Sequence, residues 1–155
     1  MMSYNLYKLQ LVKMPGEFTC TNKGNNSPYE IASAFEEVFH LSTSAEEQFC
    51  MFCLDTKNKV IGAHVVSQGT LNRSFVHPRE IFKRAIVNNA NAVIFGHNHI
   101  SGDTTPSNGD CEMTKRLMEV GDLIGIKVLD HLILSPSHEH PGYVYRSMLE
   151  EGDLI

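Results

Sequence analysis

Alternating and continuous apolar runs along the chain predict a series of β-strands. Residues 4–12 alternate in polarity, with Leu9 and Leu11 at apolar positions, as expected of a strand that buries one face. Further runs of apolar and β-branched residues predict strands at residues 47–54, 60–67, 92–95, 126–134 and 143–145. The turn at residues 55–59 would join two of these strands directly.

Between the strands, apolar residues recur at helical spacing. The first helix begins at Ser27, with Pro28 in its first turn and Glu30 completing a capping box. Pro78 opens a second helix and Ser107 a third. The buried stripes would use Ile31, Phe35, Val38 and Phe39, then Ile81, Phe82, Ala85 and Ile86, then Met113, Leu117 and Val120. Because strands and helices alternate, we expect an α/β or α+β fold with a mixed sheet covered by helices.

Length and composition narrow the class of protein further. The chain has 155 residues, 42% of them hydrophobic and 20% charged, which suits one globular domain with one core. The net charge of -5 argues against a protein that coats nucleic acid, although it does not exclude a local basic patch. We find neither a secretory signal nor an apolar run long enough to span a membrane, so we expect a cytoplasmic protein that does not enter the bilayer.

A Cys-x-x-Cys pair at Cys50 and Cys53 suggests a redox motif or half of a zinc site. The pair lies in the apolar run FCMFCLD, which predicts a buried strand. Residues three apart on a strand face opposite sides, so these two thiols would not converge on one metal ion. We therefore interpret both cysteines as small buried apolar residues.

A possible metal site follows the strand at residues 92–95. His97 and His99 are separated by one residue at the end of that strand, so their side chains project to the same side. Asp110, in the first turn of the next helix, can fold back to supply a third ligand. Two histidines and one carboxylate with an open fourth position are typical of catalytic zinc, although iron or manganese would also suit them. A purely structural alternative is that Ser107 caps the helix and Asp110 stabilises its first turn.

A hydrolase of this kind also needs a group that accepts and returns protons. The candidates are Glu46, Glu47, Glu80 and Asp103, and the residues alone do not choose between Glu46 and Glu47. Glu46 and Glu47 have a purely structural interpretation as well, as a solvent-exposed acidic pair in the loop before a strand. His131, in the pair Asp130-His131, could support a ligand, but we favour a histidine of the core or sheet face.

The pattern His97-x-His99-x7-Ser107-x-x-Asp110 resembles the JAMM (MPN+) metalloprotease motif. The surrounding sequence, from QFCMFCLDTKNKVIGAHVVSQG through VIFGHNH and SGDTTPSNGD to VLDHLILS, resembles the RadC-like branch of that superfamily over about residues 46–147. The resemblance implies a cytidine-deaminase-like layout, in which a mixed, curved sheet is flanked by helices and zinc binds near its middle. It also implies that Glu47 is the catalytic acid/base, and that Ser107 donates a hydrogen bond to the oxyanion as well as beginning its helix.

The sequence departs from the family pattern in two ways. Ile100 stands where the family usually has Pro after the second histidine, which would soften the following loop without removing a ligand. RadC-like proteins typically carry an N-terminal helix-hairpin-helix region associated with DNA, and we expect no such module here. We expect a single domain over residues 1–155, with its core at about 46–147 and an N-terminal strand and helix in 1–45.

These observations favour a zinc metallopeptidase or isopeptidase acting on an unidentified peptide or protein substrate. The alternative is a non-catalytic or accessory protein related to DNA repair, in which the metal serves structure. Nucleic acid is therefore a less favoured partner. A second copy of the chain could pair along the edge strand expected at residues 4–12 to form a homodimer.

Overall fold

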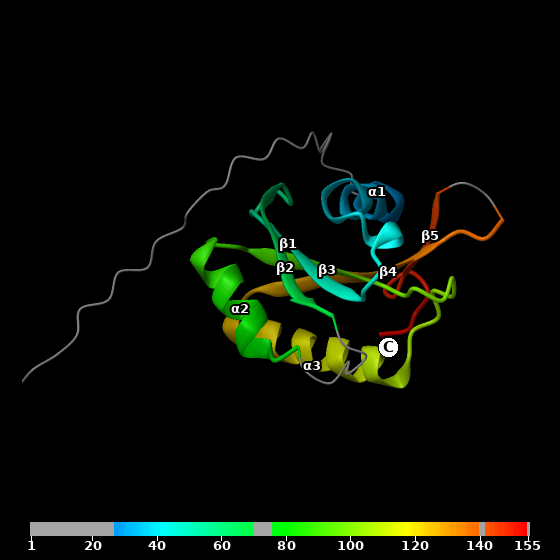
Figure 1. Cartoon of the computed structure of the whole chain (residues 1–155). Coiled ribbons are helices and arrows are strands. Elements are labelled where there is room, and N and C mark those ends of the chain that lie inside the picture. The colour runs from blue at the N-terminus through cyan, green and yellow to red at the C-terminus, as the bar shows by residue number, and fades with distance from the viewer. Residues whose placement is uncertain (1–26, 70–75, 140–141, 155) are drawn as a thin grey trace, which may run out of the picture.

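The computed structural model describes residues 27–69, 76–139 and 142–154, which form a mixed sheet with helices on both faces (Figure 1). The sheet order is β2-β1-β3-β4-β5, and only the β3–β4 pair is parallel. The strands are β1 (Gln48–Leu54), β2 (Val60–Gln68), β3 (Ala92–Asn98), β4 (Lys127–Pro136) and β5 (Tyr143–Ser147). The expected mixed α/β class is confirmed, and the strand expected at residues 4–12 lies outside the described residues.

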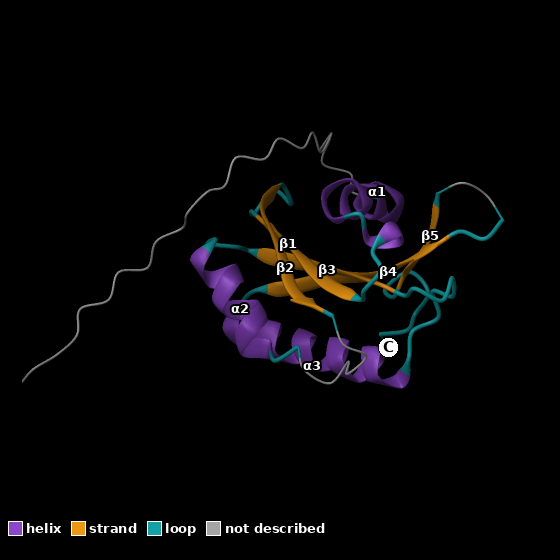
Figure 2. Cartoon of the chain, in the orientation of Figure 1, coloured by secondary structure: helices purple, strands orange, loops and turns teal. Residues whose placement is uncertain are grey.

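Helices cover the two faces of the sheet unequally (Figure 2). One face carries α1 (Pro28–Phe39) and the short 3-10 helix η1 (Leu41–Thr43), and the other carries α2 (Pro78–Val87) and α3 (Asn108–Ile124). None of the helices that the structure describes is long and apolar enough to cross a membrane.

The helix starts follow from local hydrogen bonding. At α1, the Glu30 N–H donates to the Ser27 hydroxyl and the Ser27 N–H donates to the Glu30 carboxylate, as the capping box predicts. At α2, His77 is the cap, because its ring Nδ1 accepts a hydrogen bond from the Arg79 N–H at 3.1 Å. These interactions satisfy N–H groups that have no partner within the helix.

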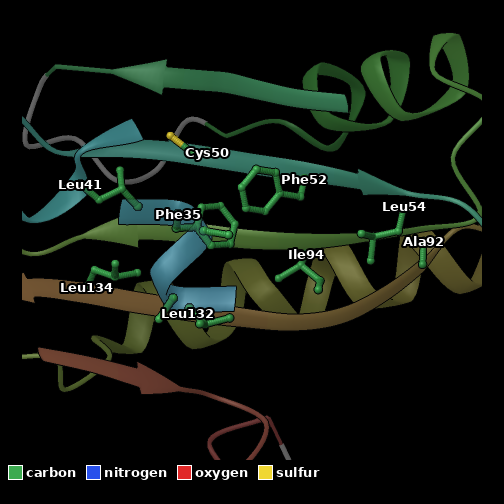
Figure 3. Packing of buried hydrophobic residues seen from close by; sticks show 11 residues of the cluster. Phe35, Leu41, Cys50, Phe52, Leu54, Ala92, Ile94, Leu132 and Leu134 are labelled. Atoms are coloured by element: carbon green, nitrogen blue, oxygen red, sulfur yellow. The ribbon is translucent and has the colours of Figure 1, made fainter. Parts of the chain in front are cut away.

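Two apolar clusters lie on opposite faces of the sheet. On the α1 face, Phe35 packs against Phe52 with ring centroids 4.3 Å apart, and Cys50 belongs to the same cluster (Figure 3). On the other face, Cys53 belongs to a cluster that packs beneath α2 and α3. Cys50 and Cys53 therefore point to opposite sides, as predicted, and neither forms a disulfide.

Strand β3 runs further than its apolar residues suggest. It continues through His97 to Asn98, because these residues pair with Ile133 and Leu134 of β4 while His97 also lies opposite Phe49 of β1. Neighbours on both sides thus complete the hydrogen bonding of a polar strand end. The consequence is that the first histidine of the motif lies within the sheet and the second follows it directly.

Candidate metal centre

The motif residues His97, His99 and Asp110 meet in a buried cluster at the end of β3. Their candidate ligand atoms all lie within 4.8 Å of one another. The two Nε2 atoms of the histidines are 2.9 Å apart. The Asp110 Oδ1 lies 3.6 Å from the His97 Nε2, and its Oδ2 lies 3.4 Å from the His99 Nε2. All three side chains are buried, so the predicted convergence of the three residues is confirmed.

This arrangement suits a metal ion for a chemical reason. Two imidazole nitrogens and a carboxylate, packed together in a buried site, are well matched to a divalent cation. Without one, two nitrogens at this separation need a proton between them, since lone pairs repel. The cluster is thus suited to binding a metal ion, and its donor set alone does not single out zinc.

A capping box holds the carboxylate of Asp110. The Ser107 N–H donates to the Asp110 Oδ2 at 2.7 Å, and the Asp110 N–H donates to the Ser107 hydroxyl at 3.1 Å. Burial by itself raises the pKa of Asp110, but the His99 and His97 rings and the Ser107 bonds outweigh it and lower the pKa below its usual value. Asp110 is therefore held as a carboxylate facing both histidines.

Two groups outside the motif hold the histidine rings. The His97 Nδ1 lies 2.7 Å from the His131 Nε2, and the His131 Nδ1 lies 2.6 Å from the Thr114 hydroxyl. The His99 Nδ1 lies 2.8 Å from the backbone carbonyl of Asp103, which can only accept a hydrogen bond. Complete burial lowers the pKa of His131 to about 4, so its ring is neutral.

Sequence reasoning missed part of this support. It favoured a core role for His131, whereas the structure places the ring against a candidate ligand, and it did not single out Thr114 at all. Phe95 and His131 are register partners on parallel strands, so His131 lies on the same sheet face as His97. The sequence could have indicated this role only if the β3–β4 register had been known.

The backbone of His99 is anchored to β4. Its N–H donates to the Leu134 carbonyl at 2.9 Å, and its carbonyl accepts a hydrogen bond from the Ser135 hydroxyl. Ile100, which stands at the usual Pro position, lies in an exposed turn. The bonds to β4 hold His99 without help from the residue that follows it.

The four carboxylates considered as the base lie in different parts of the structure and have different partners. Glu46 is exposed and accepts a hydrogen bond from the Gln68 side chain at 3.1 Å. Glu80 lies on α2, where it pairs with Lys83. The Asp103 carboxylate accepts a hydrogen bond from the Thr105 N–H. None of these three contacts involves the candidate ligands.

Glu47 comes directly before β1. Phe49 of β1 lies opposite His97 of β3, and its ring stacks near the His97 ring with centroids 6.3 Å apart. Glu47 stands two residues before Phe49, so the alternation of side chains along an extended chain is expected to put it on the face that carries Phe49. The same alternation is expected to put Glu46 on the opposite face.

His64 and His138 have partners outside the cluster. The His64 Nε2 lies 2.8 Å from the side-chain nitrogen of Asn88. The His138 Nε2 lies 3.2 Å from the backbone carbonyl oxygen of Ser101. Cys111, the residue after Asp110, is partly exposed and is not part of the cluster.

A mixed sheet flanked by helices, with a buried His-His-Asp cluster at a strand end, is the arrangement of a JAB/MPN-type domain. The chain belongs to the RadC-like JAB domain family, whose sequence profile matches residues 26–152. The predicted resemblance is thereby confirmed. The family and the cluster together fit a metal-dependent hydrolase.

Proteins from several bacteria are similar to this chain. A UPF0758 protein of Finegoldia magna is 50% identical over 110 residues, which cover 71% of this chain and 48% of the relative. A UPF0758 protein of Desulfitobacterium hafniense is 46% identical over 130 residues, covering 83% of this chain and 53% of the relative. The chain thus spans about half the length of the curated relatives it matches.

Proposed function

We propose that this protein is a zinc-dependent metallopeptidase or isopeptidase that hydrolyses an amide bond in a peptide or protein. The observation that carries the proposal is the buried cluster of His97, His99 and Asp110, a nitrogen and oxygen donor set without thiolates. Structural zinc sites are usually closed by cysteines, whereas catalytic sites use sets of this kind. The Cys-x-x-Cys pair, divided between the two faces of the sheet, does not contribute to the site.

His97, His99 and Asp110 would hold the ion. When bound, it supplies a Lewis acid that lowers the pKa of a coordinated water and polarises the scissile carbonyl. Glu47 would accept a proton from the attacking water as the new carbon–oxygen bond forms. It would then return that proton to the amine nitrogen as the carbon–nitrogen bond breaks. The pairing of Phe49 with His97, two residues after Glu47, supports this role.

Ser107 would donate a hydrogen bond to the oxyanion that develops on the carbonyl oxygen. Its oxygen accepts the Asp110 N–H, which leaves the hydroxyl hydrogen to donate. Its side chain is partly exposed at the start of α3, beside the buried carboxylate. Helix capping and oxyanion stabilisation are thus compatible at this residue.

The test is to incubate zinc-loaded protein with a peptide library prepared from a bacterial proteome and to identify new termini by mass spectrometry. We expect cleavage by the wild type, and a loss of about 10²–10⁴-fold in rate for Glu47→Gln with zinc content unchanged. Glu46→Gln is the matched control and should cleave at the wild-type rate.

His97→Ala should lose both zinc and cleavage, while His64→Ala should keep both, as measured by elemental analysis of the purified proteins. Cleavage by Glu47→Gln at the wild-type rate would remove Glu47 from the mechanism. Absence of cleavage by a zinc-loaded wild type would favour the accessory, non-catalytic alternative. Loss of the fold on zinc removal would identify the ion as structural.

A further inference from the structure

A continuous chain of buried polar contacts runs from the backbone of α3 to the His97 ring. The Thr114 hydroxyl lies 2.6 Å from the Asp110 backbone carbonyl and 2.6 Å from the His131 Nδ1. The His131 Nε2 then lies 2.7 Å from the His97 Nδ1. Thr114 and His131 are both completely buried, so water does not supply alternative partners for them.

The protons in this chain can run in either of two directions, because each ring nitrogen can donate to its neighbour or accept from it. In the direction that suits a metal ion, the Thr114 hydroxyl donates its one hydrogen to the Asp110 carbonyl. The Thr114 oxygen therefore accepts a hydrogen bond from the His131 Nδ1–H. His131 then presents the lone pair of its Nε2 to His97.

In this direction the His131 Nε2 accepts a hydrogen bond from the His97 Nδ1–H. The His97 lone pair then lies on Nε2, the atom that faces Asp110. His99 reaches the same tautomer by donating from Nδ1 to the Asp103 carbonyl. In this arrangement both Nε2 lone pairs are available to a cation beside Asp110. In the opposite arrangement the His97 Nε2 carries the proton that lies between the two rings.

We propose that Thr114 and His131 are positioning residues that hold His97 in the Nδ1–H tautomer, so that its Nε2 serves as the metal ligand. This inference rests on the metal site of the proposed function. Its rival is a purely packing role for His131, whose ring lies edge-on to Phe49 and Phe95 with centroids 5.3 and 5.9 Å away. The packing role predicts no dependence on the Thr114 hydroxyl.

The direct test is nitrogen-15 NMR of the full chain with labelled histidine, with and without zinc. Two-bond nitrogen–proton couplings report which ring nitrogen carries the proton. With zinc bound, we expect Nδ1–H tautomers for His97, His99 and His131 and zinc on Nε2 of the first two. A zinc-bound Nδ1 at His97, or a proton on Nε2 of His131 in the zinc-bound protein, would overturn the proposal.

The second test removes the hydroxyl while keeping the shape. Thr114→Val leaves the His131 Nδ1 without its acceptor, so we expect a change of tautomer at His131 and zinc affinity roughly 10–100-fold weaker, measured by competition with a chromophoric chelator. Thr114→Ser restores the hydroxyl and should restore both readouts. Thr43→Val, which removes a hydroxyl bonded to the His40 carbonyl in η1, is the control.

The outcomes separate this inference from the proposed function. Zinc binding and cleavage by the wild type, with wild-type affinity and tautomers in Thr114→Val, would refute the positioning role and leave the hydrolase intact. Failure of the wild type to bind zinc would refute both. If Thr114→Val does not fold, the wild-type spectra and Thr114→Ser still decide the matter.

Discussion

Gly96 precedes the first candidate ligand on β3, and the Phe35 ring of α1 fills the space beside its Cα. A Cβ at this position would lie 2.7 Å from the Phe35 Cδ1 and 2.8 Å from the Cε1. The ring has little room to move away, because it is completely buried and its centroid lies 4.3 Å from that of Phe52. Gly96→Ala should therefore force α1 away from β3.

The expected size of the effect follows from two opposing contributions. Overpacking of a well-packed core costs about 1–3 kcal/mol. Replacing glycine also restricts the unfolded chain, which offsets about 0.4–1 kcal/mol. The middle values of the two ranges, about 2 and about 0.7 kcal/mol, give an expected net loss of about 1–2 kcal/mol in the free energy of unfolding. At roughly 2–4 °C per kcal/mol for a domain of this size, the melting temperature should fall by about 2–8 °C.

Urea unfolding of the metal-free protein measures this loss without a contribution from bound ions. Phe35→Leu makes room at the contact, so the double variant should be more stable than the sum of the two single changes predicts, by at least about 0.5 kcal/mol. Gly109→Ala is the control, because its Cβ would meet only the Ser107 hydroxyl oxygen, at 3.8 Å. Wild-type stability of Gly96→Ala, or strict additivity with Phe35→Leu, would refute the reasoning.

Two further outcomes test the site and the core. Zinc at about 100 times its dissociation constant should raise the free energy of unfolding by about 2.7 kcal/mol in the wild type but not in Asp110→Asn, as followed by thermal unfolding; an equal rise in both would place the ion elsewhere. Iodoacetamide at pH 8 should modify Cys111 before Cys50 and Cys53, as read by peptide mass spectrometry. Burial raises the pKa of the latter two thiols to about 12 and excludes the reagent, so early modification of either would contradict their buried placement.

Much of the fold could be predicted because its signals are local. The Ser27 capping box, the Pro78 helix start and the apolar runs each depend on residues within a few positions of one another. The alternation of side chains along a strand also predicts that Cys50 and Cys53 lie on opposite faces of the sheet. The end of β3 was placed too early, because His97 and Asn98 are held in the sheet by partners on β1 and β4 that local patterning does not include.

In the candidate site, too, some residues could be predicted from local spacing and others depend on pairing between distant strands and helices. His97, His99 and Asp110 could be proposed from spacing, since a strand end and a helix start determine where their side chains point. Thr114 and His131 could not, because their contact joins α3 to β4 and depends on the parallel register of β3 and β4. The choice between Glu46 and Glu47 likewise required a family resemblance or the knowledge that Phe49 pairs with His97.

Ser107 is a demanding case, because its capping role and its proposed oxyanion role would fail together in Ser107→Ala. Loss of the cap costs about 1 kcal/mol and removes the acceptor of the Asp110 N–H, which loosens the helix start that carries this ligand, so reduced turnover in that variant would not identify the cause. Ser107→Gly separates the two roles, since glycine at a cap costs only a few tenths of a kcal/mol while the hydroxyl is removed. We expect Ser107→Gly to keep its zinc affinity and stability and to lose about 10²–10³-fold in turnover. Turnover at the wild-type rate would reduce Ser107 to a helix cap that holds Asp110 in place.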